Sequence, residues 1–193
     1  MSSAGAPPAT SVRYLIDAKR STFIVRAFAT GMLSAFGHSP TIAIPDLQGE
    51  VRFNAGSPED ASLHLVIQAA SLTVTDDISA KDRREIEHKM HDEVLETEGF
   101  AEVIYQCPKA SAVQKIGDDL YSAVLNGELS LHGVTQTQPV TARVVLKGDT
   151  LRATGEFSVR MSDYEIKPVS AAGGTVKLKD ELKLSFDINA RQG

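Results

Sequence analysis

Residues 121–146, YSAVLNGELSLHGVTQTQPVTARVVL, decide the fold because they contain two alternating segments joined by a turn. In the first segment every second residue on one side is small or apolar, namely Ala123, Leu125, Gly127, Leu129 and Leu131. After a turn predicted over residues 133–139, the alternation resumes with Val140, Ala142, Val144 and Leu146. A period of two is typical of a half-buried strand, because successive side chains point to opposite faces. The stretch therefore predicts a hairpin with one buried face and one solvent-exposed face.

The chain has 193 residues and an apolar fraction of 42%, which is enough to build one hydrophobic core. One domain is the default at this length. The first residues are small, include Pro7 and Pro8, and carry too little apolar surface to order themselves. We therefore assign residues 1–11 to a flexible N-terminal tail and residues 12–193 to a single β-barrel domain.

Charge and cysteine content narrow the function classes. The formal net charge is −5 and no basic stripe is interleaved with aromatic residues, so nucleic acid is not an expected partner. Cys107 is the one cysteine, so no internal disulfide can form, and we interpret it as a buried small hydrophobe. The sequence shows neither a secretory signal nor an integral membrane segment. We expect a cytoplasmic protein, or a periplasmic one if a signal peptide has been removed.

Alternation recurs along most of the chain and indicates further strands. They are predicted over residues 12–16, 21–29, 47–53, 62–70, 101–107, 112–116, 120–131, 138–147, 151–161 and 181–190. Residues 21–29 are apolar on both sides, so we expect both faces to be covered, by the chain itself or by a partner chain. Short amphipathic strands joined by turns favour a sheet that closes on itself, because closure removes exposed edges. The predicted fold class is all-β, a closed antiparallel barrel of about eight strands.

One helix is predicted between the strands, over residues 79–92, where the apolar period changes from two to about four. Ser79 and Asp82 have the spacing of a capping box. The helix carries one narrow apolar stripe, made of Ile86, Met90 and Val94. Because its other faces are charged, we expect it to lie at an edge or an end of the sheet.

Two segments lack strand periodicity and are predicted to be loops. Residues 162–179 contain Pro168 and a Gly-Gly pair. Residues 30–45 are apolar for a loop, since they include Leu33 and Phe36, and we expect them to fold over the core or over the mouth of a cavity.

Inward positions of the strands are the candidates for ligand contact. They are Phe23, Val25, Leu125, Leu129, Phe157, Val159, Leu184 and Phe186, and Leu33, Phe36 and Met90 could close one end. A barrel completely filled by such side chains would show the same pattern and bind nothing. Both interpretations stay open at this point.

Several motifs resemble those of the YceI-like family. The segment Leu131-His132-Gly133-Val134-Thr135, followed by Pro139-Val140, is similar to the family signature Leu-His-Gly-Val-Thr-Lys-Pro-Val. The opening Tyr14-Leu15-Ile16-Asp17 and the element Ser162-Asp163-Tyr164-Glu165-Ile166 also resemble family motifs, although Glu165 stands where the family has glycine. The resemblance covers roughly residues 12–190.

The resemblance implies a lipocalin-like barrel whose bore holds an amphiphile with an isoprenoid tail, either a polyprenyl phosphate or a quinone. It implies a binding or carrier protein, often a homodimer. The residues show no catalytic motif, so we expect no catalytic residues and no cofactor beyond a bound isoprenoid or quinone. The energetics are compatible, because each buried CH₂ contributes about 0.8 kcal/mol, so that ten groups supply about 8 kcal/mol before ordering costs.

Three polar residues are candidates for contact with a head group. His132 lies at a strand-to-turn boundary, where its ring is expected to fix the turn by hydrogen bonding, with ligand contact as the alternative. Arg83 and Arg84, near the helix start, are most simply a solvated face, and their alternative role is to receive a phosphate head group.

Histidines supply the alternative of a metal site. His88 and His91 are three residues apart on the predicted helix and could meet His38, although such spacing is common on solvated helices. Two further function classes therefore remain: a metal-dependent enzyme that uses these three residues, and a stress-response or interaction protein with a filled barrel and no ligand.

Overall fold

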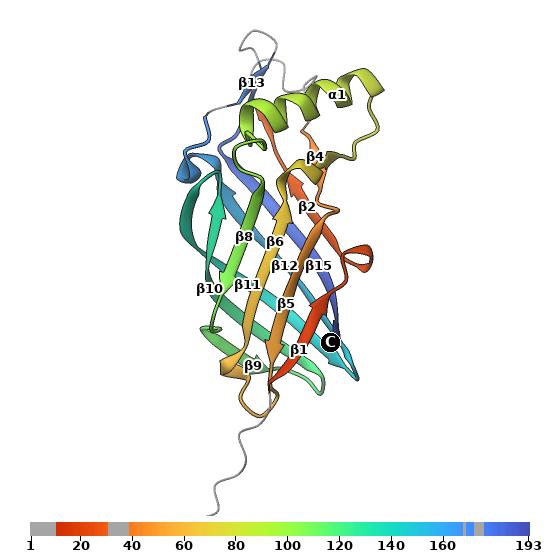
Figure 1. Ribbon diagram of the computed structural model, residues 1–193, viewed down its shortest axis with the longest axis vertical. Coiled ribbons are helices and arrows are strands. Elements are labelled where there is room, and N and C mark those ends of the chain that lie inside the picture. The colour runs from red at the N-terminus through yellow and green to blue at the C-terminus, as the bar shows by residue number, and fades with distance from the viewer. Residues whose placement is uncertain (1–10, 31–38, 168, 172–175) are drawn as a thin grey trace, which may run out of the picture.

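Eight strands close into an antiparallel barrel, which is the body of the protein (Figure 1). The computed structural model describes residues 11–30, 39–167, 169–171 and 176–193. Around the barrel the strands are β1 (Val12–Ile16), β5 (Leu47–Phe53), β6 (Ser62–Gln68), β8 (Glu102–Cys107), β10 (Leu120–Leu131), β11 (Val134–Lys147), β12 (Thr150–Arg160) and β15 (Glu181–Gln192). β15 pairs with β1 and closes the circle, so the predicted fold class is confirmed.

Shorter elements extend the barrel at its two ends. β2 (Thr22–Arg26), β4 (Thr41–Ala43) and β7 (Thr73–Val74) continue the sheet beside β15. β9 (Ala112–Lys115) pairs with β10 at the lower end in Figure 1. β3 (Ala29–Thr30), β13 (Ser170–Ala171) and β14 (Val176–Leu178) form a small separate sheet at the upper end. Single helical turns are η1 (Ala18–Arg20), η2 (Pro58–Asp60), η3 (Ala69–Ser71) and η5 (Met161–Tyr164).

The β10–β11 hairpin has the predicted inward face but a shorter turn than predicted. Tyr121, Ala123, Leu125, Gly127 and Leu129 alternate as buried positions along β10. The turn consists of two residues, since Leu131 pairs with Val134. His132 and Gly133 both have positive φ, at 52° and 76°, as the type I′ turn of a tight hairpin requires.

The predicted turn over residues 133–139 is therefore wrong, and β11 begins at Val134 instead of residue 138. Thr135, Gln136 and Thr137 are exposed, so they carry no apolar alternation that would reveal a strand. Their backbone nevertheless continues the ladder to β10, because two long strands can extend past the core together.

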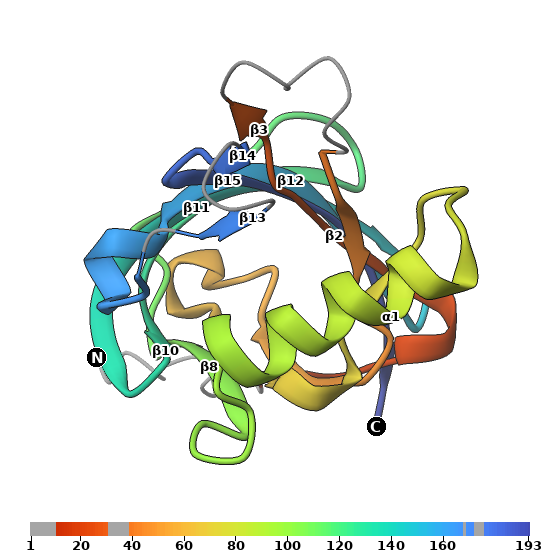
Figure 2. The same cartoon turned by 90° about the horizontal axis from the view of Figure 1, so that it is seen from above.

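A helix crosses the upper end of the barrel, as Figure 2 shows from above. In the described part of the chain it is the one α-helix, α1 (Ala80–Lys89), and the Ser79 hydroxyl caps it by accepting a hydrogen bond from the Asp82 amide at 3.1 Å. A wider π-helical turn, η4 (Met90–Val94), follows, in which the Leu95 amide donates to the Met90 carbonyl at 2.9 Å. The predicted helix and its place at the end of the sheet are confirmed.

Both predicted loops contain structure. Residues 162–179 include most of η5 and the strands β13 and β14, which sequence periodicity did not reveal. Residues 30–45 include β4, whereas Leu33, Phe36 and His38 lie outside the described residues. Along β2 the outward Ile24 is half-buried and Arg26 is exposed, so the chain itself covers this face only in part.

Replacing Glu165 with glycine is expected to stabilise the fold. Glu165 follows η5 with φ 57°, a left-handed conformation. That conformation costs a residue with a Cβ about 1–2 kcal/mol, and the entropy lost by glycine offsets part of this, so we expect a gain of about 0.5–1 kcal/mol. Urea unfolding of Glu165→Gly measures it. The control Glu156→Gly, in the extended strand β12, should lose stability, and an equal loss for both variants would contradict the prediction.

Candidate functional site: the barrel cavity

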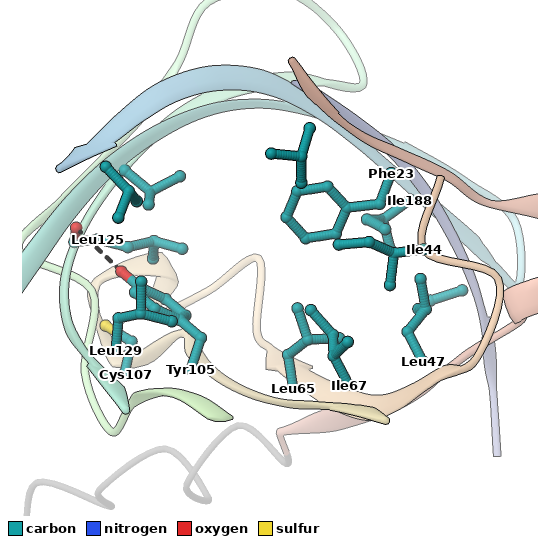
Figure 3. Packing of buried hydrophobic residues seen from close by; sticks show 14 of the residues in the cluster. Phe23, Ile44, Leu47, Leu65, Ile67, Tyr105, Cys107, Leu125, Leu129 and Ile188 are labelled. Atoms are coloured by element: carbon teal, nitrogen blue, oxygen red, sulfur yellow. Dashed lines mark hydrogen bonds between the residues drawn. The ribbon is translucent and has the colours of Figure 1, made fainter. Parts of the chain in front are cut away.

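The barrel encloses a cavity of about 690 Å³. Inward side chains from all eight barrel strands line it, together with residues of β2, β4, α1, η4 and β14. Figure 3 shows Leu65, Ile67, Leu125, Leu129, Phe23 and Ile188 pointing into this space from opposite walls. The volume falls within the range of about 300–1,000 Å³ that is typical of small-ligand pockets. The interior is therefore not completely filled by its own side chains.

Aromatic rings shape the wall at two levels. Phe23, Phe157 and Phe186 form a cluster in which Phe23 meets both partners edge to face, with ring centroids 6.3 and 6.0 Å away. Phe53 and Tyr121 form a second edge-to-face pair at 5.1 Å, near the end where β9 lies. The two rings of such a pair attract each other in addition to the stabilisation that their burial provides. The rings therefore give the cavity a fixed apolar surface.

Tyr105 contributes its ring to the lining while its hydroxyl is bound by the wall. The hydroxyl accepts a hydrogen bond from the Gly127 amide at 3.0 Å and donates to the Gln138 carbonyl at 3.0 Å, with the Leu125 carbonyl at 3.3 Å (Figure 3). Burial raises the pKa of Tyr105 to about 12. The hydroxyl therefore stays protonated, and its one hydrogen is already bonded to the backbone.

Among the described residues, the charged side chains that line the cavity all lie at the α1 end, which we call its mouth. They are Asp82, Glu85 and Lys89 on α1, and Lys177 on β14. The Lys89 ammonium pairs with Glu93 at 2.5 Å, and Asp82 accepts a hydrogen bond from the Ser79 hydroxyl at 2.7 Å. Two acids and two lysines balance in formal charge among the described residues of the lining itself.

The structure brings together the apolar residues that the alternation predicts. Every described member of the set lines the cavity, namely Phe23, Val25, Met90, Leu125, Leu129, Phe157, Val159, Leu184 and Phe186. Leu33 and Phe36 lie outside the described residues. Contact between these side chains and a ligand stays a prediction.

His132 lies outside the cavity lining. It connects the β10–β11 turn with η5 and with the segment that follows η4. Its Nε2 is 2.7 Å from the Glu96 carboxylate and its Nδ1 is 3.3 Å from the Tyr164 carbonyl. Its ring contacts Phe100 at a tilt of 51°, with centroids 4.4 Å apart. The side chain is only 11% exposed. A Cβ on Gly133 would lie 2.7 Å from Phe100 Cε1, so glycine is required beside it. This geometry agrees with the turn-fixing role and gives ligand contact no support.

The two arginines are also absent from the lining. Arg83 donates through Nη2 to the Asp76 carbonyl at 2.8 Å and is half-buried, while Arg84 is exposed. Their positions on α1 differ from those of Asp82, Glu85 and Lys89, which face the cavity. The charged residues at the mouth are therefore different from the predicted head-group candidates Arg83, Arg84 and His132.

The histidine cluster finds no support as a metal site. His88 Nδ1 pairs with the Asp92 carboxylate one turn later, at 2.5 Å, and is largely exposed. His91 Nδ1 is buried and has no hydrogen-bond partner among the described residues. His38 lies outside those residues, and within them no three His, Cys, Asp or Glu side chains are grouped to hold a metal ion.

Cys107 is buried in the core, with its Sγ 3.2 Å from the Lys109 carbonyl. Burial raises the pKa of the thiol, so it stays protonated and is a poor nucleophile. In the described ranges, no helix is both long enough and apolar enough to cross a membrane.

Sequence reasoning missed part of the site. Glu85 and Lys89 share a helical face with Ile86 and Met90, so the stripe that predicts the helix could have placed them at the mouth. Lys177 gave no such signal, because it lies on a three-residue strand whose partners, β13 and β3, are two residues long and show no alternation. Tyr105 was assigned to a strand, but nothing local shows that its hydroxyl reaches β11.

Comparison with known proteins places this architecture in a family. Over 137 residues the chain is 28% identical to a UPF0312 protein of Pseudomonas fluorescens, a match that covers 70% of the chain and 63% of that relative. The chain thus spans less than two thirds of the length of this curated relative.

Solved structures share the barrel. BcnA of Burkholderia cenocepacia superposes with a TM-score of 0.67 at 16% identity, covering 90% of this chain and 98% of that one. A polyisoprenoid binding domain from Saccharophagus degradans gives the same TM-score of 0.67 and identity of 16%, covering 94% and 99%. In addition, residues 14–190 match the family model of the YceI-like domain. The chain therefore belongs to the YceI-like family.

Proposed function

We propose that this protein binds an amphiphilic lipid with an isoprenoid tail inside the barrel and acts as its carrier. The observation that carries the proposal is the cavity of about 690 Å³, whose described lining is apolar along its depth and charged at its mouth. That distribution fits a ligand with a long apolar tail and one polar end. Membership of the YceI-like family supports the same assignment, as does the fold shared with a domain described as polyisoprenoid binding.

The tail is expected to provide most of the binding free energy. At about 0.8 kcal/mol per buried carbon, one five-carbon isoprene unit supplies about 4 kcal/mol before the costs of ordering the tail. The rings of Phe23, Phe157 and Phe186 offer flat apolar surfaces against which methyl-branched units can pack. In the described wall of the cavity, no charged side chain lies below the mouth to oppose burial of the tail.

A polyprenyl phosphate and a quinone are the two ligand classes that we propose. Asp82 and Glu85 at the mouth oppose a phosphate, whereas Lys89 and Lys177 favour it, so neither class is strongly selected by charge. The proposed role is binding without catalysis. A homodimer belongs to the same proposal, and light scattering on the purified chain measures it.

A series of ligands that differ only in tail length tests this proposal. We expect the affinity to rise at least tenfold with each added isoprene unit until the cavity is full, because every unit buries further apolar surface. Exchanging a quinone head for a phosphate on the same tail should change the affinity less than one isoprene unit does. Native mass spectrometry or isothermal titration measures both effects.

The matched control is a straight-chain amphiphile with the same head group and a similar number of carbons. An affinity that changes with the head group but not with the tail length would contradict the proposal, because binding would then occur at the mouth alone.

A further inference from the structure

A cluster of exposed cations surrounds an aromatic ring at the mouth end of the barrel. Lys179 and Lys183 both lie over the ring of Phe28, with their ammonium groups 6.0 and 5.9 Å from its centroid. Arg26 is directly opposite Lys183 in the β2–β15 ladder, and Lys177 lies two residues before Lys179. We call Arg26, Lys177, Lys179 and Lys183, with Phe28 among them, the basic rim.

The charges of the basic rim are not neutralised within the chain. All four cationic side chains are exposed, and across the described ranges none of them forms an ion pair with a carboxylate. Asp180 and Glu181, which are close in sequence to Lys179 and Lys183, accept hydrogen bonds from Ser162 at 2.6 Å and from Ser158 at 3.0 Å, and neither forms an ion pair with these cations. Like charges directly opposite in a ladder, such as Arg26 and Lys183, are destabilising. On a chain of net charge −5 the basic rim is therefore a local excess of positive charge, which an anionic partner would offset.

The basic rim is continuous with the entrance of the cavity. Lys177 and the adjacent Leu178 line the cavity, and Lys179 binds Phe28 through its amide, which donates to the Phe28 carbonyl at 2.8 Å. In Figure 2, β3, β14 and β13 lie across the upper end of the barrel from α1. A ligand that enters or leaves between these elements passes beside the cations.

We infer that the mouth end docks on an anionic phospholipid surface through the basic rim. A bilayer fits better than a nucleic acid or an acidic protein, because the cations adjoin an apolar opening and an aromatic ring, as in proteins that rest on headgroups. Docking would bring the opening against the phase in which a lipid ligand resides. The inference rests on the proposed lipid binding for its purpose, but it concerns a separate surface.

A single tryptophan reports on docking, because the chain contains no Trp. We expect the fluorescence of Phe28→Trp to shift to the blue with ligand-free vesicles of phosphatidylcholine and phosphatidylglycerol, and not with phosphatidylcholine alone. Adding Lys179→Gln and Lys183→Gln should weaken partitioning about 30-fold, since each cation near such a surface contributes a roughly fivefold effect. Salt should weaken it further.

The matched control is Ile116→Trp, a 50%-exposed position beyond β9 at the opposite end of the barrel, which should show no shift. Flotation of the unaltered chain with the same vesicles measures docking without any substitution, so the result does not depend on whether the variants fold. Equal binding to neutral vesicles, a shift at Ile116→Trp, or binding to heparin without flotation would overturn the inference. Docking without isoprenoid uptake would overturn only the proposed function, and uptake without docking only this inference.

Discussion

Leu129→Arg is expected to abolish uptake of isoprenoid lipids, lowering affinity by at least a hundredfold. Leu129 is 8% exposed, lines the cavity and pairs with Tyr105 across the β8–β10 ladder. An arginine there would place a guanidinium against apolar walls, where a buried ion without a partner costs several kcal/mol. A tail that entered would also have to remove the water around that charge. The tail-length titration and urea unfolding measure the losses of affinity and stability.

The control for Leu129→Arg is Val145→Arg in the neighbouring strand β11. Val145 is 39% exposed and lies outside the lining, so its stability should change by about 0.5 kcal/mol or less and its affinity should not change. Ala142→Phe provides a second test without a charge, because Ala142 lines the cavity and a larger ring there should shorten the longest tail accepted. Full affinity in both Leu129→Arg and Ala142→Phe would contradict tail binding in the barrel.

Gly127→Ala is expected to cause a large loss of stability for the addition of a single methyl group, about 3 kcal/mol. A Cβ at this position would lie 2.5 Å from Tyr105 Cζ and 2.7 Å from the Gln106 carbonyl oxygen. Rotation of Tyr105 cannot relieve both contacts, because the second is with backbone. The strand must shift, which also breaks the hydrogen bond between the Gly127 amide and the Tyr105 hydroxyl.

Gly99→Ala is the matched control for Gly127→Ala. A Cβ at Gly99 would meet only the Glu96 carbonyl oxygen, at 3.5 Å, which is an ordinary contact. Urea unfolding should therefore separate the two variants clearly. Equal stability of both alanine variants would show that the β8–β10 wall is looser than the contacts around Tyr105 imply.

The inward faces of the barrel could be predicted from sequence because they follow a local rule. Leu125 and Leu129 in one strand, and Leu184 and Phe186 in another, stand at every second position, and this alternation alone determines which side is buried. The β10–β11 turn was less predictable. The two-residue turn requires a positive φ at His132, which a non-glycine residue rarely adopts. Contacts of the His132 ring with Glu96 and Tyr164, from other parts of the chain, support this conformation.

The mouth was less predictable than the wall because distant short elements build it. Most of the barrel strands lie between Thr30 and Lys177 in the sequence. These two residues pair in a ladder of only two residue pairs. Such short strands have no periodicity to detect. The apolar positions of the site were therefore predicted, while its charged mouth and the basic rim required the three-dimensional structure.

The most direct test is mass spectrometry of an organic extract of the purified protein, beside native mass spectrometry of the intact complex. We expect one isoprenoid lipid bound per barrel, present in Val145→Arg and absent in Leu129→Arg. An unaltered protein that carries no lipid, and that takes up neither added quinones nor prenyl phosphates, would contradict the claim that the barrel is a lipid-binding cavity.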